Sequence, residues 1–145
     1  MENIRFGRPS ASDEECVKAA RAVYASDFIE KFSDKYNHKL SERGTGLSEG
    51  EKQLLCFART ILSDPKILIL DEATSSVDTE TEAKIQKALA VLLKGRTSFV
   101  IAHRLSTIKR ADCIMYVANK NIAEAGTHEQ LMEKKGLYYA LASAH

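Results

Sequence analysis

The segment 66–78, with the sequence KILILDEATSSVD, constrains the fold of this chain more than any other. Residues 67–70 are apolar, too short a run for a helix, and alternate between isoleucine and leucine. This pattern predicts a strand that is buried on both faces, as in a parallel sheet. Asp71 and Glu72 follow it directly. Ligands of open α/β sheets bind beyond the carboxyl ends of the strands, so the acidic pair is placed where chemistry is expected.

Asp71 and Glu72 suit phosphate chemistry assisted by a metal ion. One carboxylate can hold Mg²⁺ while its neighbour orients or activates a water molecule for attack on a phosphate. A purely structural role is the alternative, in which the pair closes the strand and starts a turn. The two residue types alone leave both interpretations open.

Length and composition limit the possible classes of protein. A chain of 145 residues can bury one ordinary core. Charged residues make up 28% and the formal net charge is +1, so neither a nucleic-acid partner nor a disordered tail is indicated. No apolar run approaches the roughly 20 residues that span a bilayer, and the first residues do not resemble a signal peptide. We therefore expect a soluble globular piece that binds no nucleic acid.

The three cysteines point to a reducing compartment. Cys16, Cys56 and Cys113 are odd in number, far apart, and form no CxxC or Cys/His cluster. This pattern favours free thiols in the cytoplasm over disulfides or a zinc site.

The first third of the chain predicts a small helical element. Ser12 and Glu15 have the spacing of a capping box, which marks the start of a helix. The apolar face of this helix comprises Val17, Ala20, Val23 and Tyr24. A second short helix is expected over residues 26–32, with Phe28, Ile29 and Phe32 directed inward. Residues 34–47 are predicted to be a loop.

A second capping box, formed by Ser48 and Glu51, predicts the start of a longer helix. The helix is expected to end before Pro65, because a residue that precedes proline disfavours the helical conformation. Its apolar stripe comprises Leu54, Phe57, Ala58, Ile61 and Leu62. In one interpretation, this motif does no more than start the helix. Alternatively, the Ser48 hydroxyl and free N–H groups form an anion site, with Gly50 allowing close approach.

The remaining sequence completes an α/β pattern. Asp78 or Thr79 is predicted to cap a helix that ends near Gly95. Residues 97–102 are predicted to be a second buried strand, and His103 follows it as Asp71 follows the first, so we expect both to face one ligand. The expected elements after it are a short helix over residues 105–110, a hairpin of residues 114–117 and 122–125, and helices over residues 127–134 and 137–144.

Four motifs, in this order along the chain, resemble those of one family. They are LSEGE at residues 47–51, ILILDE at 67–72, SSVD at 75–78 and AHRLS at 102–106. The sequence resembles the nucleotide-binding domain of ATP-binding cassette (ABC) transporters of the exporter, multidrug type. The motifs resemble, in turn, the signature, the Walker B strand, the D-loop and the switch histidine, and the resemblance extends from about Glu2 to the C-terminus.

The resemblance implies roles for single residues in ATP hydrolysis. Asp71 resembles the Walker B carboxylate that is associated with Mg²⁺. Glu72 resembles the catalytic carboxylate that polarises the attacking water, and His103 resembles the switch residue that contacts the γ-phosphate. Ser76 and Asp78 belong to the D-loop segment, in which Asp78 resembles the residue that couples the two sites of a dimer.

The signature implies contact with ATP that is bound to the opposite subunit. Ser48 and Gly50 resemble the residues that close over the γ-phosphate, and Glu51 belongs to the same motif. The motif departs from the usual Leu-Ser-Gly-Gly-Gln at Glu49 and Glu51. Negative charge near a phosphate weakens binding, but Ser48 and Gly50 are retained, so we interpret the two carboxylates as a tolerated variant.

No G-x-x-x-x-G-K-[ST] motif occurs in these 145 residues, since none of the seven glycines precedes a lysine. We therefore expect an α/β, partial P-loop NTPase fold: a helical subdomain with the signature helix (residues 1–62), then the C-terminal part of the RecA-like core (residues 63–145). Its mostly parallel sheet would lack the P-loop strand, which the resemblance places between residues 97–102 and 114–117. The open edges predict self-association, or repacking of the last hairpin into the gap.

These features predict part of the ATP-hydrolysing subunit of an ABC exporter, inactive alone and using ATP and Mg²⁺ in the complete domain. The expected partners are the missing N-terminal half of the domain, a second nucleotide-binding domain and a transmembrane domain. The latter would hold the chain at the cytoplasmic face of the cell membrane. The alternative is a non-catalytic binding or assembly module that offers its signature face to a complete ATPase.

Overall fold

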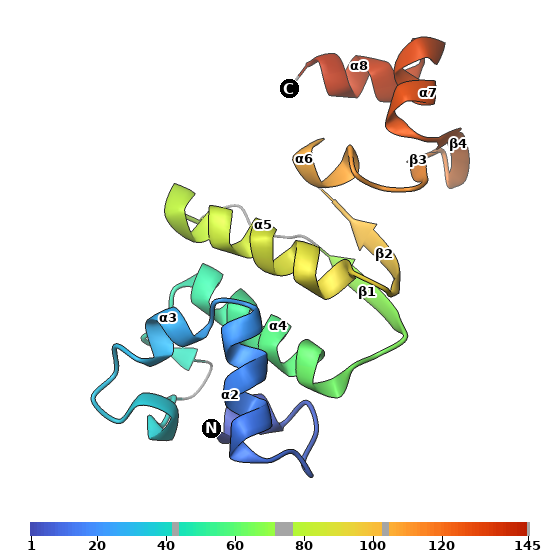
Figure 1. Ribbon diagram of the computed structural model, residues 1–145. Helices are drawn as coiled ribbons and strands as arrows, with labels where there is room; N and C mark the ends of the chain where they lie inside the picture. The colour runs from blue at the N-terminus through green and yellow to red at the C-terminus, as the bar shows by residue number, and fades with distance from the viewer. Residues whose placement is uncertain (42–43, 72–76, 103–104, 145) are drawn as a thin grey trace. The chain divides into compact units, whose positions relative to one another are not determined.

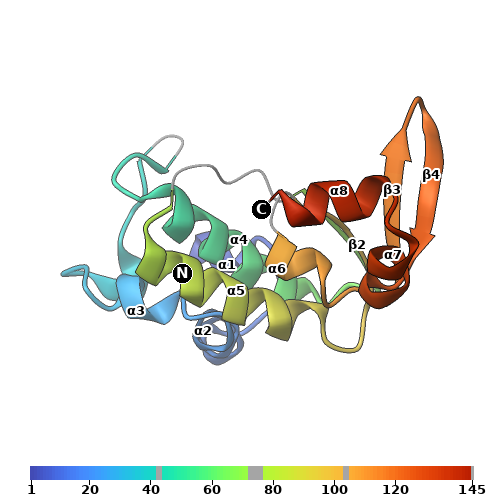
Figure 2. The same ribbon diagram turned by 90° about the horizontal axis from the view of Figure 1, so that it is seen from above.

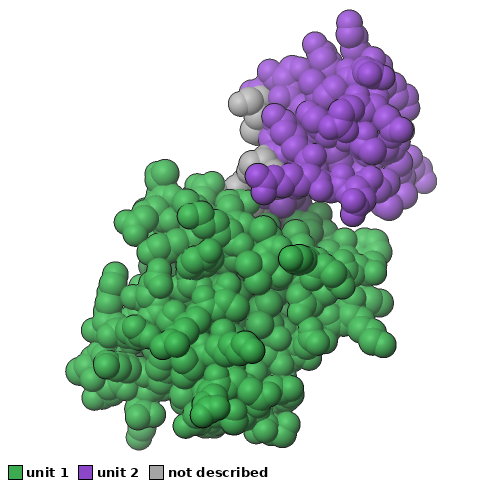
Figure 3. Space-filling model, viewed as in Figure 1, with its two compact units in different colours: residues 1–70, 74–100 green, residues 71–73, 101–145 purple. Residues whose placement is uncertain are grey.

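From residue 67 to residue 118, strands and helices alternate along the chain, as the α/β prediction requires (Figure 1). The computed structural model describes residues 1–41, 44–71, 77–102 and 105–144, without the side chain of Ser106. The chain divides into two compact units, one of residues 1–70 and 74–100, the other of residues 71–73 and 101–145 (Figure 3). The division at residues 62 and 63 concerns the subdomains of a complete domain and stays a prediction.

The first unit is mostly helical. Its elements are α1 (Glu2–Arg5), α2 (Asp13–Ala22), α3 (Ser26–Ile29), the 3₁₀ helix η1 (Lys35–Asn37), α4 (Glu49–Ser63), α5 (Thr79–Leu93) and nearly all of the strands β1 (Ile67–Asp71) and β2 (Thr97–Ile101). The long helix α4 contacts α1, α2 and α5, and Figures 1 and 2 show α4 and α5 side by side. Leu54, Phe57, Ala58 and Leu62 of the predicted stripe are buried, which confirms the period of this helix.

Two capping boxes start α2 and α4, as predicted. In each, the serine hydroxyl accepts the backbone N–H of the third helical residue, and the glutamate of that residue accepts the N–H of the serine. The helix α4 ends at Ser63, and its C-cap residue Asp64 has φ of 46° and ψ of 58°, in the left-handed region. Pro65 disfavours a right-handed helical conformation at Asp64, which explains the sharp end.

The second helix of the first third is shorter than predicted, because α3 ends at Ile29 and not at residue 32. Phe28 and Ile29 are buried as expected, whereas Phe32 is only half-buried. The Phe32 ring stacks on His38, with ring centres 4.1 Å apart. The aromatic residue thus closes the loop after α3 and does not extend the helix.

The predicted burial of the two strands, which was on both faces for β1, is wrong for this chain. Leu68 of β1 is buried with the helices of the first unit, but Ile67 and Ile69 are 63% and 74% exposed. On β2, Phe99 and Ile101 are 54% and 57% exposed. Leu68 and Leu70 of β1 pack in one cluster with apolar residues of α4 and α5, whereas the alternate side chains of this strand stay in contact with solvent.

In the described residues, the four strands form two two-stranded sheets, β1–β2 and β3–β4. The connection from β1 to β2 runs through the helix α5, and a crossover of this kind joins parallel strands. β3 pairs with β4 in a sheet of its own, and the repacking of the hairpin into the gap stays a prediction. The alternative outcome, self-association, stays a prediction.

The second unit contains α6 (Leu105–Ile108), β3 (Ile114–Ala118), β4 (Asn121–Gly126), α7 (His128–Lys134) and α8 (Leu137–Ser143). The predicted hairpin is confirmed, with β3 antiparallel to β4 (Figure 2). Asn119 and Lys120 turn the chain with φ of 50° and 63°, the conformation of the tight turns that suit a twisted hairpin. Ile114, Leu131 and Tyr138 form its small buried core.

Candidate functional site

The first turn of α4 contains the predicted signature residues in a fully capped geometry. The Ser48 hydroxyl accepts a hydrogen bond from the Glu51 N–H at 3.2 Å, and the Glu51 carboxylate accepts one from the Ser48 N–H at 2.8 Å. Ser48 is exposed, and its hydroxyl proton is not used by the bond from Glu51. The start of the helix therefore presents a hydroxyl that can donate to an anion.

The two residues that depart from the usual signature are both engaged within this turn. Glutamate and glutamine are the two residues that close a capping box, so Glu51 retains the structural function of the usual glutamine. The Glu49 carboxylate lies 2.7 Å from the Lys52 ammonium group. Negative side chains in the first turn also interact favourably with the helix dipole. The departures thus support the helix start, and their tolerance at a phosphate site stays a prediction.

Gly50 is buried between α4 and α5. A Cβ atom at this position would lie 2.3 Å from Thr81 Cγ2, 3.1 Å from Val77 Cγ1 and 3.5 Å from Ile85 Cδ1. Because carbon atoms in contact are normally 3.5–4.0 Å apart, only glycine fits here without a shift. The absence of a side chain therefore allows the two helix starts to pack closely.

Asp78 caps the start of α5. Its carboxylate accepts the Thr81 N–H at 2.9 Å, and this backbone hydrogen bond is the main reason that the pKa of Asp78 is lowered from its ordinary value of 3.8. The charged form is therefore favoured at neutral pH. The structure thus brings together the helix starts capped by Ser48 and Asp78, through the contact of Gly50 with Thr81.

The other predicted site residues fall into two groups. Asp71 is the last residue of β1 and is exposed, so its carboxylate is accessible at the end of the strand as predicted. Glu72, Ser76 and His103 lie outside the described residues, and the roles predicted for them stay predictions. Asp71 is assigned to the second unit and the signature residues to the first.

The described residues contain no group of three or more His, Cys, Asp or Glu side chains that could hold a metal ion. Asp71 supplies a carboxylate oxygen, the donor that Mg²⁺ prefers, but one carboxylate does not complete its six ligands. Phosphate oxygens and water usually provide the rest in nucleotide sites. Asp71 can therefore contribute one ligand to a Mg²⁺ ion whose other ligands come from a nucleotide and water. Within the described part of the chain, no helix is long and apolar enough to cross a membrane.

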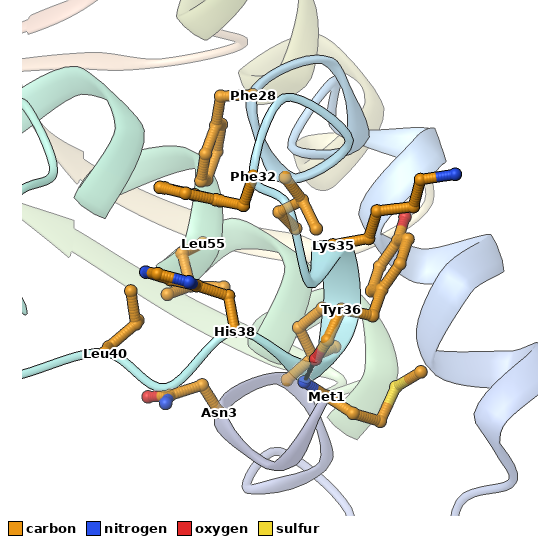
Figure 4. Close-up of a pocket in the computed structure, with 11 residues that line it drawn as sticks. Met1, Asn3, Phe28, Phe32, Lys35, Tyr36, His38, Leu40 and Leu55 are labelled. Atoms are coloured by element: carbon orange, nitrogen blue, oxygen red, sulfur yellow. Dashed lines mark hydrogen bonds between the residues drawn. The ribbon is translucent and has the colours of Figure 1, made fainter.

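A small cavity in the first unit is an unsuitable nucleotide site. It has a volume of about 40 Å³, and Figure 4 shows Phe28, Phe32 and His38 around it, with Tyr36 and Leu55 nearby. Pockets for small molecules have volumes of roughly 300–1,000 Å³. The cavity is a gap under the loop after α3, lined mainly by core residues.

Comparison with known proteins shows the family of the chain. The family model described as ABC transporter matches residues 2–75, which is half of the chain. The chain is 56% identical over 144 residues to the uncharacterised ABC transporter ATP-binding protein YknV of Bacillus subtilis, covering 99% of this chain and 24% of that protein. It is 53% identical over 141 residues to the human mitochondrial potassium channel ATP-binding subunit, covering 97% of this chain and 19% of that protein. The chain belongs to the ABC transporter family.

A solved structure agrees with the fold. The structure of a bacterial Atm1-family ABC exporter with ATP bound matches with a TM-score of 0.86 and 40% sequence identity, covering 98% of this chain and 25% of that one. This match confirms the partial P-loop NTPase fold. The chain spans about a quarter or less of the length of the proteins it matches.

Two residues of the candidate site were missed by sequence reasoning. Lys52, which pairs with Glu49, is visible in the sequence as an opposite charge three positions along a helix. Thr81, which contacts Gly50, carries no such local signal, since its place depends on how α4 meets α5.

Proposed function

We propose that this chain is part of the ATP-hydrolysing subunit of an ABC exporter and presents the start of α4 to ATP held by a second nucleotide-binding domain. The observation that carries this proposal is the capped, exposed Ser48, whose hydroxyl can donate to a phosphate while it accepts from Glu51. The family of the chain and its likeness to an exporter support it.

In this proposal the chain's other motif residues act on the nucleotide of their own domain. Asp71 would hold Mg²⁺ through a carboxylate oxygen, and Mg²⁺ would neutralise charge on the phosphates. Glu72 would orient the attacking water and accept its proton, and His103 would contact the γ-phosphate. Ser76 and Asp78 would belong to the segment that couples the two nucleotide sites.

In this proposal the phosphate cradle comes from the P-loop-bearing half of the domain, since these 145 residues contain no P-loop motif. The exposed side chains of Ile67, Ile69 and Phe99 support a covering partner for this face of the strands. We assign this place to the P-loop-bearing half of the domain. A transmembrane domain would complete the exporter and hold the chain at the cytoplasmic face of the membrane.

The test begins with calorimetric titration of the purified chain with Mg-ATP, which is expected to show no binding. Addition of the P-loop-bearing half should restore binding and hydrolysis. Hydrolysis should then fall at least about a hundredfold for Glu72→Gln, because the general base is removed. Tight binding of Mg-ATP by the chain alone would contradict the proposed division of the site.

The second candidate is a non-catalytic module that lends only its signature face to a complete ATPase. It is favoured by the exposed Ser48 hydroxyl at the capped start of α4. In this case, hydrolysis by a mixture with a complete domain would depend on Ser48 and would be insensitive to Glu72→Gln. The enzyme proposal requires sensitivity to both.

A further inference from the structure

The contact between Gly50 and Thr81 joins two segments that the proposed function places at the nucleotide. Gly50 lies in the first turn of α4, two residues after Ser48, and Thr81 lies in the first turn of α5, three residues after Asp78. Both belong to the same compact unit, in which α4 and α5 lie side by side (Figure 1). The two helix starts therefore meet at one point of direct contact.

Two further features make this point rigid. Each helix start is fixed by its own cap, with the hydroxyl of Ser48 on the Glu51 N–H and the carboxylate of Asp78 on the Thr81 N–H. Val77 and Ile85 lie near the same Gly50 position, within 3.5 Å of a Cβ atom placed there. A close-packed contact of this kind transmits a displacement of one helix directly to the other.

We propose that Thr81 is a positioning residue, which acts through Gly50 to hold Ser48 and Asp78 in one fixed arrangement toward the partner's nucleotide. This inference rests on the proposed function. It gives Gly50 a second role, the packing contact with Thr81, in addition to the close approach to phosphate that its motif implies. The methyl group of Thr81 is the part that acts, since it faces Gly50. Its backbone N–H holds Asp78.

The direction in which Gly50→Ala changes stability distinguishes the packing contact from an effect on the helix backbone. Gly50 lies in a helical turn, where alanine is intrinsically more favourable than glycine. Gly50→Ala would therefore stabilise the chain if there were room for the added carbon. With Thr81 Cγ2 only 2.3 Å away, the same substitution is expected to lower the melting temperature, on the order of 5–10 °C.

The matched variant is Thr81→Ser, which removes the Cγ2 methyl and keeps the hydroxyl and the backbone N–H. In Gly50→Ala/Thr81→Ser the new Cβ enters the space of the lost methyl. We expect this double variant to melt within about 2 °C of the wild type, with Gly50→Ala the least stable of the four proteins. An unchanged or higher melting temperature for Gly50→Ala, or no recovery in the double variant, would overturn the packing contact.

The functional part is tested by association of the full chain, in the presence of Mg-ATP, with a P-loop-bearing nucleotide-binding domain of the same family, measured by light scattering. Gly50→Ala is expected to weaken association on the order of tenfold, and the double variant to restore it. If the double variant recovers the melting temperature but not association, Thr81 has no positioning function. The effect of Gly50→Ala on association would then come from the close approach of Gly50 to the phosphate. A wild-type chain that never associates would contradict the proposed function, while the order of melting temperatures would still decide the packing contact.

Discussion

Glu124 on β4 and Tyr138 on α8 are joined by a hydrogen bond of 2.9 Å from the backbone N–H of Tyr138 to the carboxylate of Glu124. The other carboxylate oxygen accepts the N–H of Leu137, also at 2.9 Å. Glu124 thus caps the start of α8 from a separate element, because the N-cap residue Gly136 has no side chain to do so. Gly136 is needed for this approach, since a Cβ there would lie 1.8 Å from the same carboxylate.

The first prediction concerns this cap. Glu124→Gln should lower the melting temperature and speed hydrogen exchange of the α8 amides, because an amide NH₂ cannot accept the second N–H. The control is Glu133→Gln, at an exposed position of α7. Equal exchange of α8 in the wild type and in Glu124→Gln would contradict a capping function.

The second prediction is the pH dependence that this cap produces. Hydrogen bonds from Tyr138 and Leu137, in that order, lower the pKa of Glu124 from its ordinary value of 4.5, and the charge of Lys134 adds to the effect. A pKa that is lower in the folded state than in the unfolded state contributes stability above pH 4.5. This stability is lost as the pH falls through the pKa of the folded state.

The wild type and Glu124→Gln should therefore differ most in melting temperature near neutral pH, and the difference should shrink in acid. Thermal melts between about pH 7 and 3 measure it. The carboxyl groups of Glu15, Asp78 and Glu129, whose pKa values are also lowered, are present in both proteins. A difference in melting temperature that grows as the pH falls would contradict this prediction.

The third prediction separates the two functions of Ser48. Ser48→Ala should cost about 1 kcal/mol of unfolding free energy through loss of the helix cap. Ser48→Asn keeps a capping side chain and should restore most of this stability, but it removes the hydroxyl. If Ser48 contacts phosphate, Ser48→Asn will melt like the wild type and still associate poorly with an ATP-loaded partner domain. Full association would limit Ser48 to capping.

The fourth prediction concerns Arg96, which joins the end of α5 to the turn after α4. Its guanidinium group donates to the Asp64 carboxylate at 2.6 Å, the Leu92 carbonyl at 2.7 Å and the Pro65 carbonyl at 3.2 Å, and its side chain is only 14% exposed. Arg96→Met should lower the unfolding free energy by about 2 kcal/mol in chemical denaturation, because these carbonyl groups lose a charged donor.

Arg21→Met is the matched control for Arg96. Arg21 lies 3.9 Å from Glu30 with both side chains more than half exposed, so its loss should change the unfolding free energy by less than about 0.5 kcal/mol. Equal effects of the two arginine substitutions would show that the three bonds of Arg96 add nothing to stability.

The fifth prediction concerns the exposed apolar face of β1 and β2. The purified chain should show an average mass that rises with concentration in sedimentation experiments, as side chains such as Ile69 and Phe99 associate. Ile69→Lys should reduce this rise, whereas Val91→Lys, on an exposed position of α5, should not. A wild-type chain that stays monomeric at all concentrations would contradict the expected self-association.

Several elements were predictable because their signals are local. Ser12 with Glu15, and Ser48 with Glu51, mark helix starts through contacts three residues apart. The hairpin was found from its turn residues and alternating strands. Of the candidate site, Ser48, Gly50, Glu51 and Asp78 were placed correctly at helix starts, while the phosphate-binding roles of these residues stay predictions. The burial of β1 was misjudged, since four apolar residues indicate a strand without showing what covers each face.

The sequence by itself determined where α2, α4 and α5 begin, where the hairpin turns, and to which family the motifs belong. Only the tertiary structure decided that Gly50 packs against Thr81, and that Glu124 caps a helix from a neighbouring strand. The physical reason is the range of the interactions. Caps and turns depend on backbone groups a few residues apart, so residue types encode them directly. Close contacts between elements depend on how whole apolar faces fit together, and no short stretch of sequence contains that information.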